Sequence, residues 1–149
     1  MSIHQSNSSE QQNAEHFMLK SLEEMFGFQF EKNAELPVSV TVQPDAIDPT
    51  RKVVVEAYAR IGRVKGAQLN KIKGDILKLA LVGKELGSEW RKILCFASSE
   101  AAKYAQGKSW VAEAAKVFGI EVIVVELPVE QHEKVIQAQK RQIMVNPQQ

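Results

Sequence analysis

The chain has 149 residues, of which 44% are hydrophobic and 25% are charged, and its net charge at pH 7 is +1. That length fits one domain with one core, and the near-neutral charge leaves any electrostatic targeting to a local patch. The single cysteine, Cys95, excludes an intrachain disulfide and a multi-cysteine zinc site; its apolar surroundings, KILCFA, predict a buried thiol. The sequence has no signal-peptide pattern and no apolar run near the ~18 residues of a membrane span, so we expect a cytoplasmic protein without a membrane partner.

The amino-terminal third is predicted to hold a tail, a helix and a strand. Residues 1–12 are polar and are expected to form a disordered tail, which leaves 13–149 as a single α/β domain. Apolar residues at helical spacing predict a helix over 13–26, with Gly27 as its stop. Residues 36–43, LPVSVTVQ, alternate valine with polar residues and predict a half-exposed strand.

The rest of the chain alternates strands and helices. The segment 44–50, PDAIDPT, carries the prolines and aspartates of a turn. The expected elements after it are a strand at 52–61, a helix at 65–86 ending at Gly87, a strand at 92–98, a helix at 99–118, a strand at 120–127 and a helix at 129–143. Early strands joined by short turns should be antiparallel, and strands joined through helices should be parallel. The expected fold is therefore α/β, a mixed sheet flanked by helices on both faces.

The strand KVVVEAYARI contains one carboxylate, Glu56, among apolar residues. Burying a charge costs several kcal/mol, roughly, unless it is paired, hydrogen-bonded or bound to a metal. Glu56 alternates with Val54 and Tyr58 on one face, and a hairpin would bring Asp45 or Asp48 beside it. Mg²⁺ or Mn²⁺ would join two such carboxylates, because these ions prefer oxygen ligands.

Two helices add further candidates to this site. Glu15 falls on the apolar side of the first expected helix, where it either joins the site or lies solvated in a frayed first turn. The second expected helix and the turn before it carry seven positive charges against two negative ones, an excess suited to a phosphate backbone or to a solvated face. On this helix Gln68 and Asp75 share one flank, with Lys71 one turn from Asp75 and able to pair with it.

Four features of the sequence together resemble the PD-(D/E)XK nuclease superfamily, which has the restriction-endonuclease-like fold. They are a helix with an acid, a Pro-Asp pair before a strand, a Glu in the next strand, and a helix with Gln and Lys. The similarity in topology covers roughly residues 15–127. It implies Asp45 or Asp48 as the first metal ligand and Glu56 as the second. The family's lysine, two residues after the Glu, would fall at Tyr58, which is a departure from the motif.

Two interpretations of that departure remain. In the first, Lys71 or Lys73 of the following helix replaces the lost lysine, and the chain is a Mg²⁺- or Mn²⁺-dependent nuclease. In the second, the site is degenerate, and the fold binds nucleic acid or protein without catalysis. In the catalytic version an aspartate holds the metal with Glu56: we prefer Asp48 because it is nearer the strand, the Pro-Asp pair favours Asp45, and the sequence does not decide between them. Lys71 complements the transition-state charge, and Gln68 positions the water or contacts phosphate.

Other functions find less support in the sequence. GRVKG lacks the spacing of a nucleotide-binding P-loop, and the three histidines lack the spacing of a zinc site. Trp90 and Trp110 are expected to pack rather than stack on bases. A homodimer is compatible with the sequence, which does not determine the oligomeric state.

Overall fold

The computed structural model describes residues 8–32, 34–38 and 41–145, and these form a mixed sheet between helices. The sheet order is β1-β2-β3-β4, with β1 antiparallel to β2 and the other neighbours parallel. The elements in chain order are α1 (Ser9–Phe26), β1 (Ala46–Asp48), β2 (Val53–Tyr58), α2 (Ala67–Leu86), β3 (Arg91–Phe96), α3 (Ser99–Ala102), the 3-10 turn η1 (Lys103–Ala105), α4 (Trp110–Val117), β4 (Ile120–Val124) and α5 (Val129–Val145).

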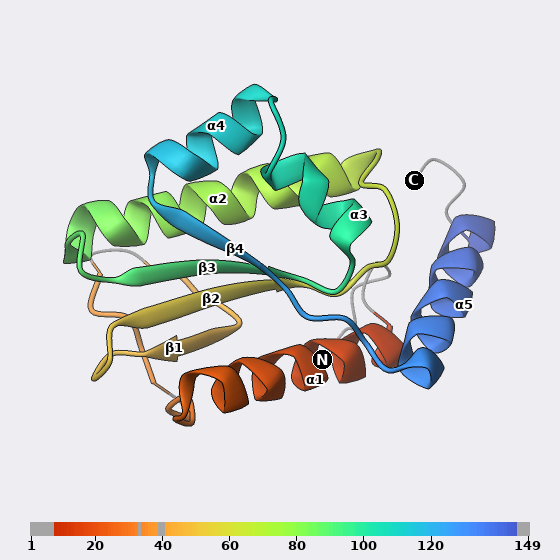
Figure 1. Cartoon of the computed structure of the whole chain (residues 1–149), viewed down its shortest axis with the longest axis horizontal. Coiled ribbons are helices and arrows are strands. Elements are labelled where there is room, and N and C mark those ends of the chain that lie inside the picture. The colour runs from red at the N-terminus through yellow and green to blue at the C-terminus, as the bar shows by residue number, and fades with distance from the viewer. Residues whose placement is uncertain (1–7, 33, 39–40, 146–149) are drawn as a thin grey trace.

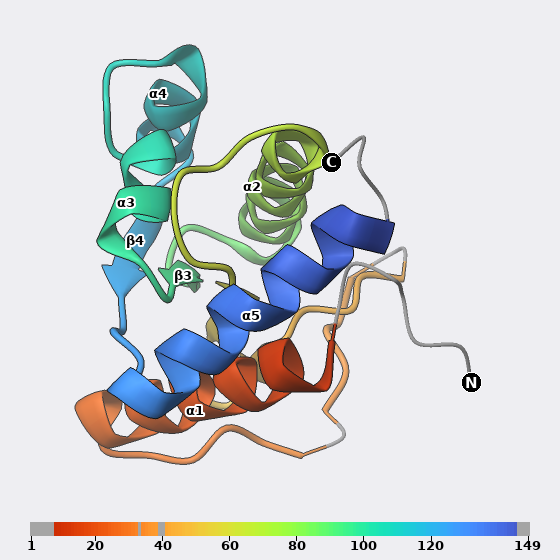
Figure 2. The same ribbon diagram turned by 90° about the vertical axis from the view of Figure 1, so that its right-hand side faces the viewer.

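Helices cover both faces of the sheet, as the sequence predicts (Figure 1). The helices α2, α3 and α4 lie on one face, and α1 lies on the other. Helix α5 packs against α1 and crosses the end of the sheet toward the start of α2 (Figure 2). None of the helices in the described ranges is long and apolar enough to cross a membrane.

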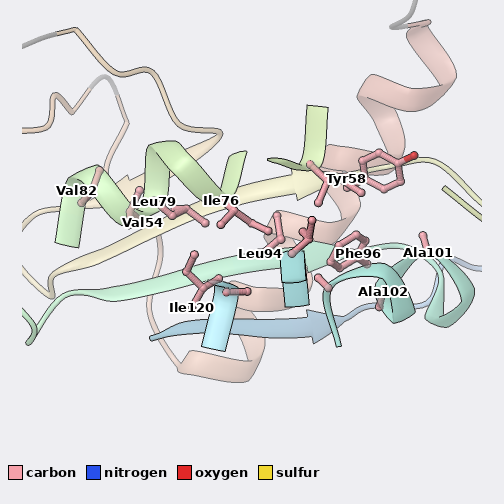
Figure 3. Packing of buried hydrophobic residues seen from close by; sticks show 14 of the residues in the cluster. Val54, Tyr58, Ile76, Leu79, Val82, Leu94, Phe96, Ala101, Ala102 and Ile120 are labelled. Carbon is pink, nitrogen blue, oxygen red and sulfur yellow. The ribbon is translucent and has the colours of Figure 1, made fainter. Parts of the chain in front are cut away.

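Two apolar clusters, one on each face, hold the layers together. On the α2 face, Val54 and Tyr58 of β2 pack with Leu94 and Phe96 of β3 beneath Leu79 of α2 (Figure 3). On the other face, alternate residues of β2 and β3 pack against the apolar stripe of α1; the buried side chains that carry this contact are Val53, Val55, Ala57, Ile93, Cys95, Ala14, Met18 and Leu22. Cys95 is fully buried, which confirms the prediction, and burial raises the pKa of its thiol to about 12.

The first helix begins earlier than the sequence pattern predicts. Ser8 caps α1 by accepting from the Gln11 amide, and the Gln11 side chain accepts from the Ser8 amide in return. This capping box satisfies two amides that would otherwise lack partners in the first turn. Residues 9–12 are therefore helical, and the expectation of a disordered tail is wrong for them; residues 1–7 lie outside the described ranges.

Two other elements differ from expectation. No strand forms in the described part of 36–43, whose positions 39 and 40 lie outside the described residues, and the short strand β1 lies instead within the predicted turn 44–50. The helix expected over 99–118 is divided into α3, η1 and α4. Its division follows from Gly107 and from Ser109, whose side chain accepts from the Ala112 amide and starts a new helix.

Candidate functional site

The site is built around Glu56, which lies on β2 between β1 and β3 with only 2% of its surface exposed. Asp45 immediately precedes β1 and lies beside Glu56. The Asp45 amide donates to the Val55 carbonyl at 3.0 Å, and Asp45 Oδ2 accepts from the Ala57 amide at 2.7 Å. The backbone of β2 thus fixes Asp45 opposite Glu56, while the rest of Asp45 is exposed to solvent.

Two more acidic side chains reach the same place from helices on opposite sides. Glu15 of α1 lies close enough to Asp45 for that carboxylate to raise its pKa, and Asp75 of α2 is almost fully buried nearby. We call Glu15, Asp45, Glu56 and Asp75 the acidic cluster. Because α1 begins at Ser9, Glu15 lies beyond the first turn, so the frayed-turn interpretation of this residue is wrong.

Two lysines of α2 partly offset this negative charge. Lys78 Nζ lies 3.2 Å from Glu56 Oε1 and 3.5 Å from Asp75 Oδ1. Lys71 Nζ donates to Asp75 Oδ2 at 3.2 Å, which is the pairing that helical spacing predicts. Glu56 Oε1 is buried without a hydrogen bond, so its contact with Lys78 is an ion pair of poor alignment.

The pKa values in the cluster reflect this imbalance. Burial, followed by the charges of Asp45 and Asp75, raises the pKa of Glu56 to about 8, although Lys78 opposes the rise. Burial and the neighbouring Asp45 likewise raise the pKa of Glu15 to about 8. Burial raises the pKa of Asp75 as well. Burial disfavours the ammonium of Lys78, but its two carboxylate neighbours outweigh that cost and raise its pKa. Four carboxyl groups facing two ammonium groups would carry an excess of two negative charges if all ionised.

The preference for Asp48 over Asp45 requires correction. Asp48 pairs with Val53 in the register of the hairpin, three residues along β1 from Asp45. Its carboxylate is fully buried and accepts from the Arg51 amide at 2.9 Å and from the Arg51 guanidinium at 3.0 Å. Asp48 therefore builds the turn between the strands, and Asp45 is the aspartate that accompanies Glu56.

The choice of Lys71 or Lys73 for the migrated cation is corrected in part. Lys73 lies 5.4 Å from the ring centre of Trp110 and takes no part in the acidic cluster. Lys78 contacts Glu56 instead, although the sequence pattern did not single it out. A signal existed, because Gln68, Lys71, Asp75 and Lys78 recur at spacings of three and four and therefore share one face of α2.

The expectation that both tryptophans pack is confirmed for one and wrong for the other. Trp90 is buried and packs, as expected, whereas Trp110 is 70% exposed, so the expectation of packing is wrong for it. Tyr58, at the position of the family's lysine, is buried against Phe96, and burial raises the pKa of its hydroxyl to about 12. Tyr58 is thus a neutral phenol throughout the physiological range.

The acidic cluster offers oxygen ligands of the kind that Mg²⁺ and Mn²⁺ prefer. In the described part of the chain, no three His, Cys, Asp or Glu side chains already share the geometry of a metal site. Mg²⁺ needs less than that, because it commonly binds through one or two carboxylates and keeps several waters. Asp45, exposed and held by its hydrogen bond to Ala57, and Glu56, with an oxygen that lacks a hydrogen bond, fit that pattern.

Comparison with family models, with curated proteins and with solved structures finds no match to this chain.

Proposed function

We propose that this chain is a divergent member of the PD-(D/E)XK nucleases, with a restriction-endonuclease-like fold, and that it hydrolyses phosphodiester bonds in nucleic acid with Mg²⁺ or Mn²⁺. The observation that carries the proposal is the acidic cluster. Its four carboxyl groups come from α1, the segment before β1, β2 and α2, and two of their pKa values rise to about 8. Burial is the largest cause of these rises and the neighbouring carboxylates are the next, so a divalent cation would lower the cost of ionising the groups together.

Asp45 and Glu56 would hold the metal ion. When bound, the ion supplies a Lewis acid for the scissile phosphate and lowers the pKa of an attacking water. Hydrolysis joins that water's oxygen to phosphorus and breaks the bond to one ester oxygen, which leaves with a proton. Glu15, whose pKa Asp45 helps to raise, would orient Asp45 by donating a hydrogen bond from its protonated carboxyl group.

The cationic role falls to α2 rather than to β2. Lys78 and Lys71 flank Asp75 and are both half-exposed, so their ammonium groups remain able to approach a substrate. A phosphoryl group that gains negative charge in the transition state is stabilised by cations placed in advance. Gln68, one turn before Lys71, contacts phosphate or orients the water.

A second candidate function, a nuclease-like fold that binds nucleic acid or protein without catalysis, is favoured by one observation. Lys78 forms an ion pair with Glu56, which a metal ion would have to displace or share. Tyr58 in place of the family's lysine is consistent with the same loss of activity.

Cleavage of labelled single- and double-stranded DNA and RNA with Mn²⁺ tests the proposal. We expect Asp45→Asn and Glu56→Gln to lower the rate at least 100-fold, whereas Glu89→Gln, a surface control paired with Lys52, keeps it. Lys78→Met should lower the rate far more than Lys73→Met, which removes the same charge from the same helix. Cleavage that survives both carboxylate substitutions would refute the proposed site; no cleavage of any substrate by pure wild type would favour the binding module.

A further inference from the structure

A second polar site lies beyond the end of β2, on the side of the molecule where α5 crosses the sheet. It is a pocket of 460 Å³. We call it the basic pocket; its walls come from the end of β2, the loop to α2, the first turn of α2 and α5, and are made by Tyr58, Arg60, Ile61, Gly62, Arg63, Lys65, Gln68, Gln139 and Ile143.

Positive charge is concentrated in the basic pocket. Arg60, Arg63 and Lys65 line it, and among the residues that the structure describes no acidic side chain does. The first turn of α2 begins at the same place without a side-chain cap, so the positive end of the helix dipole adds to the field. Charge of this sign in a hollow attracts an anion and raises its local concentration.

The walls of the basic pocket are held in place by hydrogen bonds from α5. The Gln139 side chain accepts from the Ile61 amide at 2.7 Å and donates to the Ile61 carbonyl at 3.0 Å. Gln142 accepts from the Arg60 guanidinium at 2.7 Å. These bonds connect segments about 80 residues apart in sequence and fix the backbone of the loop, which is the preorganisation that a binding site requires.

Gln68 indicates that the basic pocket receives a polar ligand. Its side chain is only 9% exposed, it lines the pocket, and its Oε1 is buried without a hydrogen-bond partner. An unpaired buried polar atom destabilises the fold, and most buried polar atoms in native proteins have a partner. A side-chain amide can present either its oxygen or its NH₂ group, so Gln68 can bond an oxygen of a bound anion as well as a donor.

The basic pocket adjoins the acidic cluster. Tyr58 is two residues from Glu56 on the same face of β2, a separation of about 7 Å along the strand. Gln68 is seven residues from Asp75 on the same face of α2, about 10 Å along the helix. Ile61 and Ile143 provide an apolar wall beside the cations.

We propose that the basic pocket binds a phosphate group of the nucleic-acid strand, next to the phosphate that lies at the acidic cluster. Arg60, Arg63 and Lys65 bind the phosphate oxygens, Gln68 donates from its amide, and the apolar wall contacts the attached sugar or base. This assignment deepens the proposed nuclease function and rests on it for the identity of the ligand, but phosphate binding itself needs no catalysis.

Anisotropy of single-stranded DNA oligonucleotides labelled at the 3′ end, measured in EDTA, tests binding without cleavage. We expect the double variant Arg63→Gln/Lys65→Gln to bind at least tenfold more weakly than wild type. Its log Kd should also depend less steeply on log salt, by about one for each phosphate that the protein no longer neutralises. Lys73→Gln/Lys84→Gln, with the same change in charge on α2, is the matched control and should bind within about twofold of wild type. Equal affinities in all three proteins would overturn the proposal.

The oligonucleotide end identifies which phosphate is bound. If the basic pocket holds a terminal group, a 5′-phosphate should bind tighter than a 5′-hydroxyl in wild type and lose that advantage in Arg63→Gln/Lys65→Gln. If it holds an internal group, both oligonucleotides should bind alike and weaken together. Stabilisation of wild type by inorganic phosphate with no oligonucleotide binding would overturn the assignment to a nucleic-acid strand.

Gln68→Leu separates a ligand-binding amide from a structural one. Because Gln68 Oε1 has no protein partner, the apolar replacement should leave the melting temperature unchanged or raised while it weakens oligonucleotide binding at least fivefold. A lower melting temperature with unchanged affinity would contradict the assignment. Glu56→Gln in the same assay should bind at least as well as wild type, so loss of cleavage and loss of this site remain distinguishable.

Discussion

Replacing Glu56 with glutamine tests whether this carboxylate destabilises the metal-free fold. Its pKa of about 8 in the folded protein lies far above the ordinary 4.5, chiefly through burial and the charges of Asp45 and Asp75. Between these pH values the folded state binds a proton that the unfolded chain releases, so the free energy of unfolding falls as pH rises. The neutral glutamine lacks this dependence, and Lys78 keeps Asp75 as a partner at 3.5 Å.

The size of the effect follows from the same two pKa values. The difference between them corresponds to about 1.4 kcal/mol for each pH unit. Above pH 8, the unfolding free energy of the variant should therefore exceed that of wild type by at most about 5 kcal/mol. Near pH 5 the advantage falls to about 1 kcal/mol, because Glu56 is then protonated in the folded state and this pH lies only slightly above the pKa of 4.5 in the unfolded chain.

Urea unfolding followed by circular dichroism at pH 5, 7 and 9, in EDTA, measures both free energies. We expect the variant to be more stable than wild type by an amount that grows with pH. Glu89→Gln, on the surface, should follow wild type at each pH. A variant less stable than wild type at pH 9, with the same pH dependence, would show that Glu56 is ionised and satisfied by Lys78, and would remove the basis of the metal proposal.

Two further expectations concern metal and the hairpin turn. Mn²⁺ should raise the melting temperature of wild type but not of Glu56→Gln, because a ligand that binds only the folded state stabilises it by mass action; no shift in wild type would count against a metal site. Asp48→Asn should lower the unfolding free energy by about 1–3 kcal/mol because its charged bonds to Arg51 are weakened, while the Mn²⁺ response persists; an absent response would restore Asp48 as a ligand.

The sheet and its helices were predictable where the pattern is local. The alternation of Val54, Glu56 and Tyr58 predicted the two faces of β2, and helical spacing predicted the pairing of Lys71 with Asp75. The start of α1 was not predicted although its capping box is also local, because the polar composition of residues 1–12 favours a disordered tail.

The aspartate beside Glu56 was not predictable in the same way, because it depends on the register of the hairpin. Asp48 is nearer to Glu56 in sequence than Asp45 is. In an antiparallel hairpin, however, residues pair outward from the turn, so Asp48 pairs with Val53, and Asp45, farther from the turn, lies opposite Glu56. Asp48 forms the turn with Arg51, where Lys52 adopts a positive φ of 60°, and Asp45 is thereby brought alongside β2. Distance along the chain was the wrong measure of proximity.

The position of the cations also bears on whether Tyr58 is compatible with the proposed activity. Helix α2 presents Lys78, Asp75, Lys71 and Gln68 in succession along one face, from Glu56 toward the basic pocket. A nucleic-acid strand lying along this face would meet carboxylates and ammonium groups first and the arginines of the loop next. A lysine at position 58 would lie in the apolar contact that Tyr58 makes with Phe96, where burial disfavours a charge. The half-exposed lysines of α2 avoid that cost, so under the proposed function a cation on α2 would let β2 stay apolar at its end and still place a positive charge beside Glu56.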